Sequence, residues 1–470
     1  MAAFLMNSED DLSIALLSFL LPQDALRARA ASRRGMLFEV GSSDRLWKCF
    51  LERDFGLSDA ARRPTGEAKE PEPLRQAYGD WHVAARELDL DPAQNVEHRH
   101  PWRTVALWYR LKRWARQNAP NIAATLQPPA WGTAYLLVPA EKVAPLVKGF
   151  WGIVNGQSTV QDAEGGGHFL PIEGTVSYLG IFGGYSAYDH EVSMHFVPLE
   201  NASSITSIFW VQYPEIRNNY PHCMVFAIAP AFAKVLFLDL VDGMVYCFQS
   251  SGRQEMATLK ACAPAGGEPG MPLIRWAEEL VHRLESGIYE VSPLRPEMGP
   301  RSLGINLFPQ RGPLYKEATT RGVHVSGSAV FMLERPRQGW TYSIRFKLVG
   351  TEEERGFKTC QLKKRHWIIA EEGNVAPEHV EGDGVIGLFP ILNDEGWLAN
   401  RASDPHLQYE AHGQWPAPFI YQSSARFRSS ACGTFGGYVE FIPGTIQKPT
   451  GPPFNVRVEP FPFSMPDFLY

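Results

Sequence analysis

Cysteine is scarce in this chain. Six cysteines are spread over 470 residues, and none of them forms a C-x-x-C pair. Disulfide-stapled domains and zinc ribbons both place cysteines at short, fixed spacings. The spacing therefore excludes these two classes and indicates buried or free thiols in a reducing compartment.

An excess of basic residues is also missing. Lys and Arg number 45 against 51 Asp and Glu, for a net charge of −6. A general nucleic-acid binder carries a basic footprint, so this balance argues against nucleic acid as a partner.

Long apolar runs are missing too. No run approaches the roughly 18 residues that cross a bilayer. The apolar segment 16–21 follows Ser8-Glu9-Asp10-Asp11, where a signal peptide needs positive charge. We therefore expect a cytoplasmic and/or nuclear protein with no membrane partner.

The usual catalytic and metal-binding patterns are not found. G-x-S-x-G and H-E-x-x-H do not occur, and the glycine-rich run 164–168 is not followed by the Gly-Lys-Ser/Thr of a P-loop. His98 and His100 supply only two ligands, whereas a zinc site needs three or four, so a solvated loop is the better interpretation. We predict a chain that is not an enzyme and that uses no cofactor or metal.

The residues that are present divide the chain into three parts. Apolar residues make up 44%, enough for real cores, and the length predicts about three domains. Residues 8–56 have helical spacing, 57–78 are a linker rich in Pro, Glu and Arg, and 79–290 mix helices with strands. Residues 291–320 form a second linker. In residues 321–470, apolar residues alternate with polar ones, which is a period of two.

Individual elements can be placed within these parts. A helix is expected over 44–55, with Leu46, Trp47, Phe50 and Leu51 on one side and Gly56 as its stop. Further helices should open near Pro101 and Pro272. Strands are expected at 224–229, 234–240 and 244–248, with Asp242-Gly243 as a hairpin turn between the last two. Alternation at Tyr342, Ile344, Phe346 and Leu348 predicts a β sandwich in the third part.

The amino-terminal part resembles an F-box. The matching segments are Leu17-Ser18-Phe19-Leu20, Ala31-Ser32-Arg33-Arg34 and Ser43-Asp44-Arg45-Leu46-Trp47. A trihelical unit this small leaves apolar surface for a partner. In the F-box family that partner is the Skp-family adaptor of a cullin ubiquitin ligase. The residues expected to contact the adaptor, or to support the contacts directly, are Leu12, Leu16, Phe19, Leu20, Leu26 and Trp47.

One departure from the family pattern bears on adaptor binding. Ser8-Glu9 stand where the family usually begins its first helix with Leu-Pro. The loss of one buried leucine contact should cost roughly 1.5–3 kcal/mol, so a tight complex would survive it and a weak one would not. A three-helix cap packed on the rest of the chain is the alternative.

The middle part is similar to the Smi/Knr (SUKH-like) domain. The matching segments are 150–157, 180–185 and the strand meander that follows. That family consists mainly of binding modules, so the resemblance implies an α+β domain with no catalysis.

The third part resembles the ApaG family over nearly its whole length. The matching segments are 361–369, 380–390, 421–424, 433–438 and 454–461, in the family's order and spacing. The resemblance implies a fibronectin-like sandwich, which agrees with the period-two pattern.

A glycine-rich loop in this part invites a nucleotide-binding interpretation. Gly382, Gly384 and Gly387 have G-x-G-x-x-G spacing, but Pro390 forbids the helix that a dinucleotide fold requires next. Two possibilities remain: a tight β connection, which we favour, and an anion site assisted by Arg365 and His366. In ApaG proteins this loop has been suspected of binding phosphate or pyrophosphate.

The expected fold is a multidomain α+β chain, with a trihelical F-box, an α+β SUKH-like domain and an all-β ApaG sandwich. The order of these domains resembles F-box-only proteins with an ApaG domain. It implies the substrate-recognition subunit of a Skp–cullin–F-box ligase, one copy per larger complex, with adaptor, cullin and protein substrate as partners. The alternatives are a phosphate or pyrophosphate sensor and a non-ligase scaffold, both built on the ApaG domain.

Overall fold

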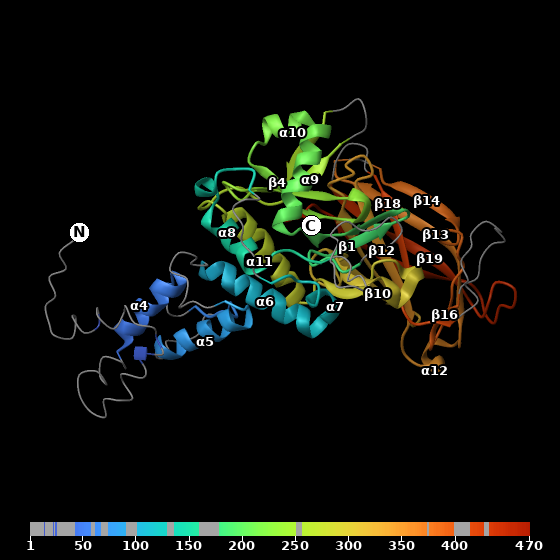
Figure 1. Ribbon diagram of the computed structural model, residues 1–470. Helices are drawn as coiled ribbons and strands as arrows, with labels where there is room; N and C mark the ends of the chain where they lie inside the picture. The colour runs from blue at the N-terminus through green and yellow to red at the C-terminus, as the bar shows by residue number, and fades with distance from the viewer. Residues whose placement is uncertain are drawn as a thin grey trace, which may run out of the picture.

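The computed structural model describes most of the chain, in stretches separated by gaps. The described residues are 14, 22, 24, 25, 43–57, 62–66, 74–90, 101–128, 136–158, 178–250, 256–373, 376–398, 414–426 and 432–470. Helices of the amino-terminal part lie at one end of the molecule, the carboxyl-terminal strands lie at the other, and a mixed region lies between them (Figure 1). The architecture is therefore multidomain α+β, as expected.

Helices α4 (Asp44–Phe55) and α5 (Leu74–Glu87) form the amino-terminal pair. The Ser43 side chain caps α4 by accepting a hydrogen bond from the Arg45 N–H, and Gly56 ends the helix in the left-handed conformation at φ 66°. Glycine adopts that conformation at little cost, so the predicted helix and its stop are both confirmed. Residues 57–78 were expected to be a linker, but α5 begins within them at Leu74.

A five-stranded antiparallel sheet lies at the centre of the middle region. Its order is β3-β4-β5-β6-β7, and its strands are β3 (His195–Phe196), β4 (Cys223–Ile228), β5 (Val235–Asp239), β6 (Val245–Gln249) and β7 (Thr258–Ala261). The predicted strands and their Asp242-Gly243 turn are confirmed, with Gly243 at φ 82°. The helical elements of this region are α6 (Trp102–Asn118), α7 (Pro120–Ala123), η2 (Ala140–Lys142), α8 (Pro145–Ile153), α9 (Leu199–Gln212), α10 (Pro214–Asn219), η3 (Pro230–Phe232) and α11 (Met271–Glu285).

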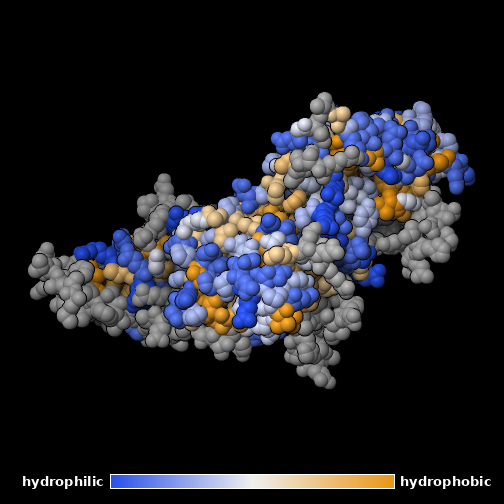
Figure 2. Space-filling view, turned by 90° about the horizontal axis from the view of Figure 1, so that it is seen from above, coloured by the Kyte–Doolittle hydropathy of each residue, from blue (hydrophilic) through white to orange (hydrophobic). Residues whose placement is uncertain are grey.

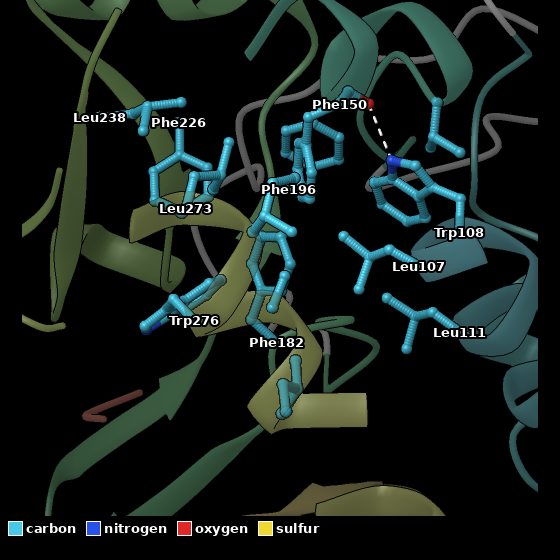
Figure 3. Close-up of a cluster of buried hydrophobic side chains, with 14 of the residues drawn as sticks. Leu107, Trp108, Leu111, Phe150, Phe182, Phe196, Phe226, Leu238, Leu273 and Trp276 are labelled. Carbon is cyan, nitrogen blue, oxygen red and sulfur yellow. Dashed lines mark hydrogen bonds between the residues drawn. The ribbon is translucent and has the colours of Figure 1, made fainter. Parts of the chain in front are cut away.

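Aromatic side chains fill the space between these helices and the strands (Figure 3). The Phe196 ring lies 5.3 Å from that of Phe150 and 5.8 Å from that of Trp108. The Trp108 indole N–H donates to the Phe150 carbonyl at 2.8 Å, which satisfies the one polar atom of a fully buried side chain. The Phe182 and Trp276 rings, 5.1 Å apart, continue the cluster towards α11.

A second, four-stranded sheet connects the middle region to the sandwich. Its order is β2-β1-β9-β8, and its elements are β1 (Gly184–Ala187), β2 (His190–Ser193), β8 (Glu290–Pro293), the 3-10 helix η4 (Pro296–Ser302) and β9 (Leu303–Asn306). Residues 291–320 were expected to be a linker, but they supply part of this sheet. Pro293 lies at the end of β8, and Pro296 and Pro300 lie in η4. A missing N–H is tolerated at such positions, so composition alone resembled a linker.

Two antiparallel sheets packed on one core form the carboxyl-terminal sandwich. One sheet has the order β10-β11-β12-β18, and the other has the order β17-β16-β15-β13-β19-β20, with β14 paired to β13. The elements are β10 (Tyr315–Thr320), β11 (Val323–Phe331), β12 (Trp340–Leu348), α12 (Glu352–Arg355), β13 (Cys360–Glu371), β14 (Glu378–Asp383), β15 (Ile391–Asn393), β16 (Gly396–Leu398), β17 (Gln414–Trp415), β18 (Phe419–Ala425), β19 (Gly433–Pro443) and β20 (Phe454–Phe463). Tyr342, Ile344 and Phe346 lie in the shared core, which confirms the predicted alternation.

The buried apolar residues form two clusters. One runs from α4 through the middle region and also includes Met332, Leu333 and Tyr470, and the other lies wholly within the sandwich. The chain therefore leaves the sandwich after β20 and ends against the middle region, where Figure 1 marks its carboxyl end. The predicted domain boundaries stay predictions.

On the face seen in Figure 2, the coloured residues are mostly hydrophilic, with apolar groups among them. Ile208 and Val211 of α9 are among the exposed apolar residues. Across the described ranges, no helix has the length and apolarity to span a bilayer.

Candidate functional site

Five of the predicted adaptor-binding residues cannot be placed. Leu12, Leu16, Phe19, Leu20 and Leu26 lie outside the described residues. Ile14 and Ala25, from the same stretch of sequence, are described and are 8% and 1% exposed in the first core cluster.

Trp47, the sixth predicted adaptor-binding residue, is covered by the chain itself. Its side chain is 2% exposed, and its ring lies 5.4 Å from Phe50 and 5.5 Å from Tyr78 of α5. Trp47 therefore supports the helix pair from inside. Sequence reasoning did not foresee this cover because the start of α5 was assigned to a linker.

A buried carboxylate joins the two helices of this pair. The Tyr78 hydroxyl donates to Asp54 Oδ2 at 2.8 Å, and Arg53 Nε donates to Asp54 Oδ1 at 2.5 Å. At the other end, the Leu74 N–H donates to Asp44 Oδ1 at 3.1 Å, where α5 begins. These contacts fix the angle between α4 and α5 and so shape whatever surface this end presents.

The glycine-rich loop of the sandwich is a tight hairpin turn. The Val385 and Leu388 N–H groups each donate to the other's carbonyl at 2.9 Å, and Ile386 and Gly387 have φ of 47° and 68°. Two successive positive φ values are typical of a type I′ turn. The Gly384 N–H donates to the Lys363 carbonyl at 2.9 Å, so three N–H groups of the loop are used within the chain.

Arg365 is directed at this loop and His366 is not. Arg365 Nη1 donates to the Asp383 and Gly384 carbonyls at 3.1 and 2.6 Å, and its guanidinium lies over Gly382. Successive side chains of a strand point to opposite faces, which places His366 on the other face of β13. The geometry is that of a β connection with an arginine bound to its carbonyls, and anion binding there stays a prediction.

His366 belongs to a separate polar row on the outer face of that sheet. Its Nδ1 lies 2.7 Å from Glu381 Oε1, its Nε2 lies 2.9 Å from His379 Nδ1, and its ring stacks on Tyr438 at 4.6 Å. Within the described ranges, no group of three or more His, Cys, Asp or Glu side chains is placed to hold a metal ion.

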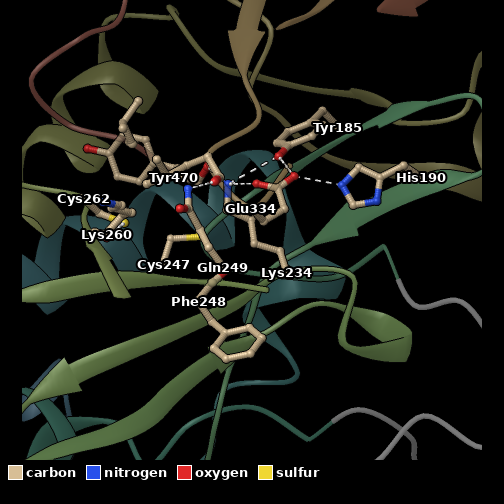
Figure 4. A network of polar contacts seen from close by, with 12 residues as sticks. Tyr185, His190, Lys234, Cys247, Phe248, Gln249, Lys260, Cys262, Glu334 and Tyr470 are labelled. Atoms are coloured by element: carbon tan, nitrogen blue, oxygen red, sulfur yellow. Dashed lines mark hydrogen bonds and ion pairs between the residues drawn. The ribbon is translucent and has the colours of Figure 1, made fainter. Parts of the chain in front are cut away.

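A buried ionic network joins the middle region to the first loop of the sandwich (Figure 4). Glu334, from the turn after β11, lies 2.8 Å from His190 Nε2 and 3.1 Å from Lys234 Nζ. Lys234 Nζ also donates to the Tyr185 hydroxyl at 3.3 Å and to the Tyr470 carbonyl at 2.5 Å. The Lys234 ammonium therefore combines one ion pair with two hydrogen bonds.

Mutual neutralisation keeps this network ionised despite its burial. Burial alone would raise the pKa of Glu334, but Lys234, His190 and Tyr185 hold it down at about 2. Burial would likewise lower the pKa of Lys234, and Glu334 outweighs that effect and raises it. Sequence reasoning missed the network because its members are distant in sequence and carry no local motif.

Comparison with known proteins first gives the class of the carboxyl-terminal region. A family model described as the ApaG domain matches residues 332–397. The Protein ApaG of Xanthobacter autotrophicus is 28% identical over 155 residues, which are 32% of this chain and 93% of its own.

Other relatives extend the likeness beyond that region. The F-box protein SKIP16 of Arabidopsis thaliana is 27% identical over 489 residues, which cover 97% of each chain. The F-box only protein 3 of Homo sapiens is 38% identical over 82 residues, 16% of this chain and 17% of its own. The resemblance to F-box proteins with an ApaG domain is confirmed: the chain is a homologue of SKIP16 and carries an ApaG domain. The SUKH-like resemblance stays a prediction.

Proposed function

We propose that this chain is the substrate-recognition subunit of a Skp–cullin–F-box ubiquitin ligase. The observation that carries the proposal is the match to an F-box protein over 97% of both chains. The predicted trihelical F-box would bind the Skp-family adaptor, and through it the cullin. The SUKH-like and ApaG regions would bind a protein substrate.

The arrangement of the molecule supports a bridging role. The α4–α5 pair lies at the far end from the sandwich, with the middle region between them (Figure 1). A receptor of this shape would hold the adaptor at one end and its target at the other. It would contribute no catalytic group. Holding a target lysine close to a ubiquitin-loaded conjugating enzyme would by itself raise the rate of ubiquitin transfer. We expect it to act as one copy per complex, in the cytoplasm and/or the nucleus.

Adaptor binding can be tested with a double truncation of apolar side chains and a control truncation elsewhere. The double change Leu16→Ala and Phe19→Ala should weaken capture of the purified chain by a Skp-family adaptor by at least about tenfold, since each change would remove apolar area that the proposed complex buries. Val211→Ala, a truncation on the exposed face of α9, should leave capture unchanged. Affinity is measured by titration at micromolar concentration, with circular dichroism to show that both variants stay folded.

The outcomes separate the proposal from the alternatives. Failure of the unmodified chain to bind any Skp-family adaptor at micromolar concentration would reject the ligase role and favour the scaffold. Equal binding by the double variant would move the interface away from these helices. Trp47→Ala is a poor probe, because it opens a cavity between α4 and α5 whether or not Trp47 meets a partner.

A further inference from the structure

One face of the sandwich is buried beneath the middle region, and it is polar. On β12, Tyr342 and Ile344 point into the core, so Ser343 and Arg345 point away from it. Ser343 pairs directly with Ser328 on β11 and with Gln422 on β18. The two serines are 0% exposed, and Gln422 and Arg345 are each 8% exposed.

The middle region closes over this polar face. The Ser186 hydroxyl of β1 lies 2.9 Å from Gln422 Oε1 and also donates to the Leu294 carbonyl at 2.6 Å. Beside it, the Tyr188 hydroxyl lies 2.6 Å from the Ser423 hydroxyl. The face is therefore an interior surface between two structural units.

The donors on this face outnumber their acceptors. Several buried polar atoms of this face have no hydrogen-bond partner within the described part of the chain. They are Ser328 Oγ, Ser343 Oγ, Gln422 Nε2 and both Nη atoms of Arg345. Native proteins leave few buried polar atoms unpaired. Ser343 is directly paired with Ser328 and Gln422, and paired residues have Cβ atoms about 5 Å apart. Arg345 lies two residues further along β12 on the same face, so its long side chain can share one small acceptor with them.

The charge on this face is also uncompensated. None of the described ion pairs includes Arg345. The negative charge of Glu290 favours the Arg345 cation, but the Glu290 carboxylate is itself paired with Arg311 at 3.4 Å. Burial lowers the pKa of Arg345 to about 10, which still leaves it cationic at neutral pH. A buried cation without a counter-charge is strongly unfavourable.

We propose that Arg345, Ser328, Ser343 and Gln422 bind a small oxyanion of the phosphate or sulfate class at the junction of the sandwich and the middle region. A guanidinium fork binds two oxygens of such an anion at once, and hydroxyl and amide donors complete its shell. The site lies on the β10-β11-β12-β18 sheet and is distinct from the glycine-rich loop that follows β14. The bound anion would neutralise Arg345 on the sandwich side of this junction.

Anion content is the direct test. The full chain is purified in phosphate, desalted into chloride and denatured, and the phosphate released is counted by a molybdate assay. Unmodified protein should release about one phosphate per chain, since one guanidinium fork holds one anion. Arg345→Met, which keeps the stem and removes the charge, should release less than about a tenth of that. Arg457→Met, an exposed arginine of β20, is the matched control and should match the unmodified chain.

A thermal measurement on the unmodified chain keeps the proposal falsifiable should Arg345→Met fail to fold. Phosphate should raise its melting temperature by at least about 2 °C over chloride at equal ionic strength. Sulfate and malonate arms show whether a tetrahedral or a carboxylate anion is preferred. Ser343→Ala, which removes one neutral donor, should weaken the effect roughly 2- to 10-fold in phosphate concentration. No released anion and equal melting in all salts would show that only water occupies the face and would overturn the proposal.

Discussion

At the scale of single residues, Glu334 links two structural units through its ionic partners. It lies in the turn after β11, whereas Lys234 and His190 belong to the middle region. The three side chains are almost completely buried, so the Glu334 carboxylate and the Lys234 ammonium depend on each other for compensation. Loss of one partner leaves a bare charge in a low-dielectric interior.

Glu334→Gln should therefore destabilise the chain by about 3–5 kcal/mol, the usual effect of breaking a buried ion pair. Chemical denaturation gives the value, and Glu381→Gln on the exposed outer sheet is the control, with a change near zero. The double variant Lys234→Met with Glu334→Gln should recover much of the loss, because it removes the orphaned ammonium. A loss of under about 1 kcal/mol for Glu334→Gln would show that the pair contributes little.

The pKa of Glu334 also predicts a dependence of stability on pH. The folded value of about 2 lies below the ordinary glutamate value of 4.5, so its stabilising effect is complete above about pH 4.5 and is lost as pH falls towards 2. The stability difference between the unmodified chain and Glu334→Gln should narrow across that window. Denaturation at pH 6 and pH 3 measures it, and an unchanged difference would contradict the assigned pKa.

At the scale of elements, the α4–α5 pair is held by an apolar stripe and one buried carboxylate. Leu46 and Phe50 are fully buried, and Asp54 accepts the Tyr78 hydroxyl within the same interface. Arg53 Nη2 donates to the same Asp54 oxygen at 2.9 Å, so loss of the Tyr78 hydroxyl removes one of two donors and one hydrogen bond to a charged group. The pair thus owes its fixed angle to a few polar contacts within a larger apolar contact.

Tyr78→Phe should cost about 1–3 kcal/mol, because it removes that donor and keeps the ring packing. In a double-mutant cycle with Asp54→Asn, the second change should add less than it does alone, since both act on one hydrogen bond. Stability is read by denaturant titration of the full chain. Strict additivity of the two changes would refute the coupling.

At the scale of the whole molecule, the end of the chain ties the units together. After β20 the chain crosses to the middle region, where the Trp276 indole N–H donates to the Leu469 carbonyl at 2.8 Å and the Leu469 N–H donates to the Cys262 carbonyl at 2.9 Å. The Tyr470 hydroxyl donates to the Trp276 carbonyl at 2.9 Å. A segment that follows the sandwich in sequence thus completes the core of the preceding unit.

Deletion of residues 468–470 should lower the stability of the middle region more than that of the sandwich. The deletion removes the buried Tyr470 side chain and the Tyr470 carbonyl that accepts a hydrogen bond from Lys234. The core cluster of the sandwich keeps all its members. Hydrogen exchange resolved by segment measures the effect: α11 and β7 should lose protection and β19 should keep it. Met465→Ser, a change to an exposed side chain just before the tail, is the control. Uniform loss across all segments would show that the two units unfold as one.

The amino-acid sequence by itself determined the local elements and the family. Helix α4 with its Gly56 stop, the Asp242-Gly243 hairpin and the alternation of β12 follow from short-range spacing, because side-chain periodicity and backbone φ preferences act over a few residues. A dinucleotide site could also be excluded from short-range sequence, because Pro390 forbids the helix that must follow the glycine-rich loop.

Only the tertiary structure decided what covers each of these elements. It placed α5 over Trp47, turned part of an expected linker into β8, η4 and β9, brought Glu334 to Lys234 and buried Arg345 without a counter-charge. These outcomes depend on contacts between residues that are distant in sequence, such as Trp47 with Tyr78 and Lys234 with Glu334. Burial, which decides whether a charge is solvated or must be paired, exists only once the chain has closed upon itself.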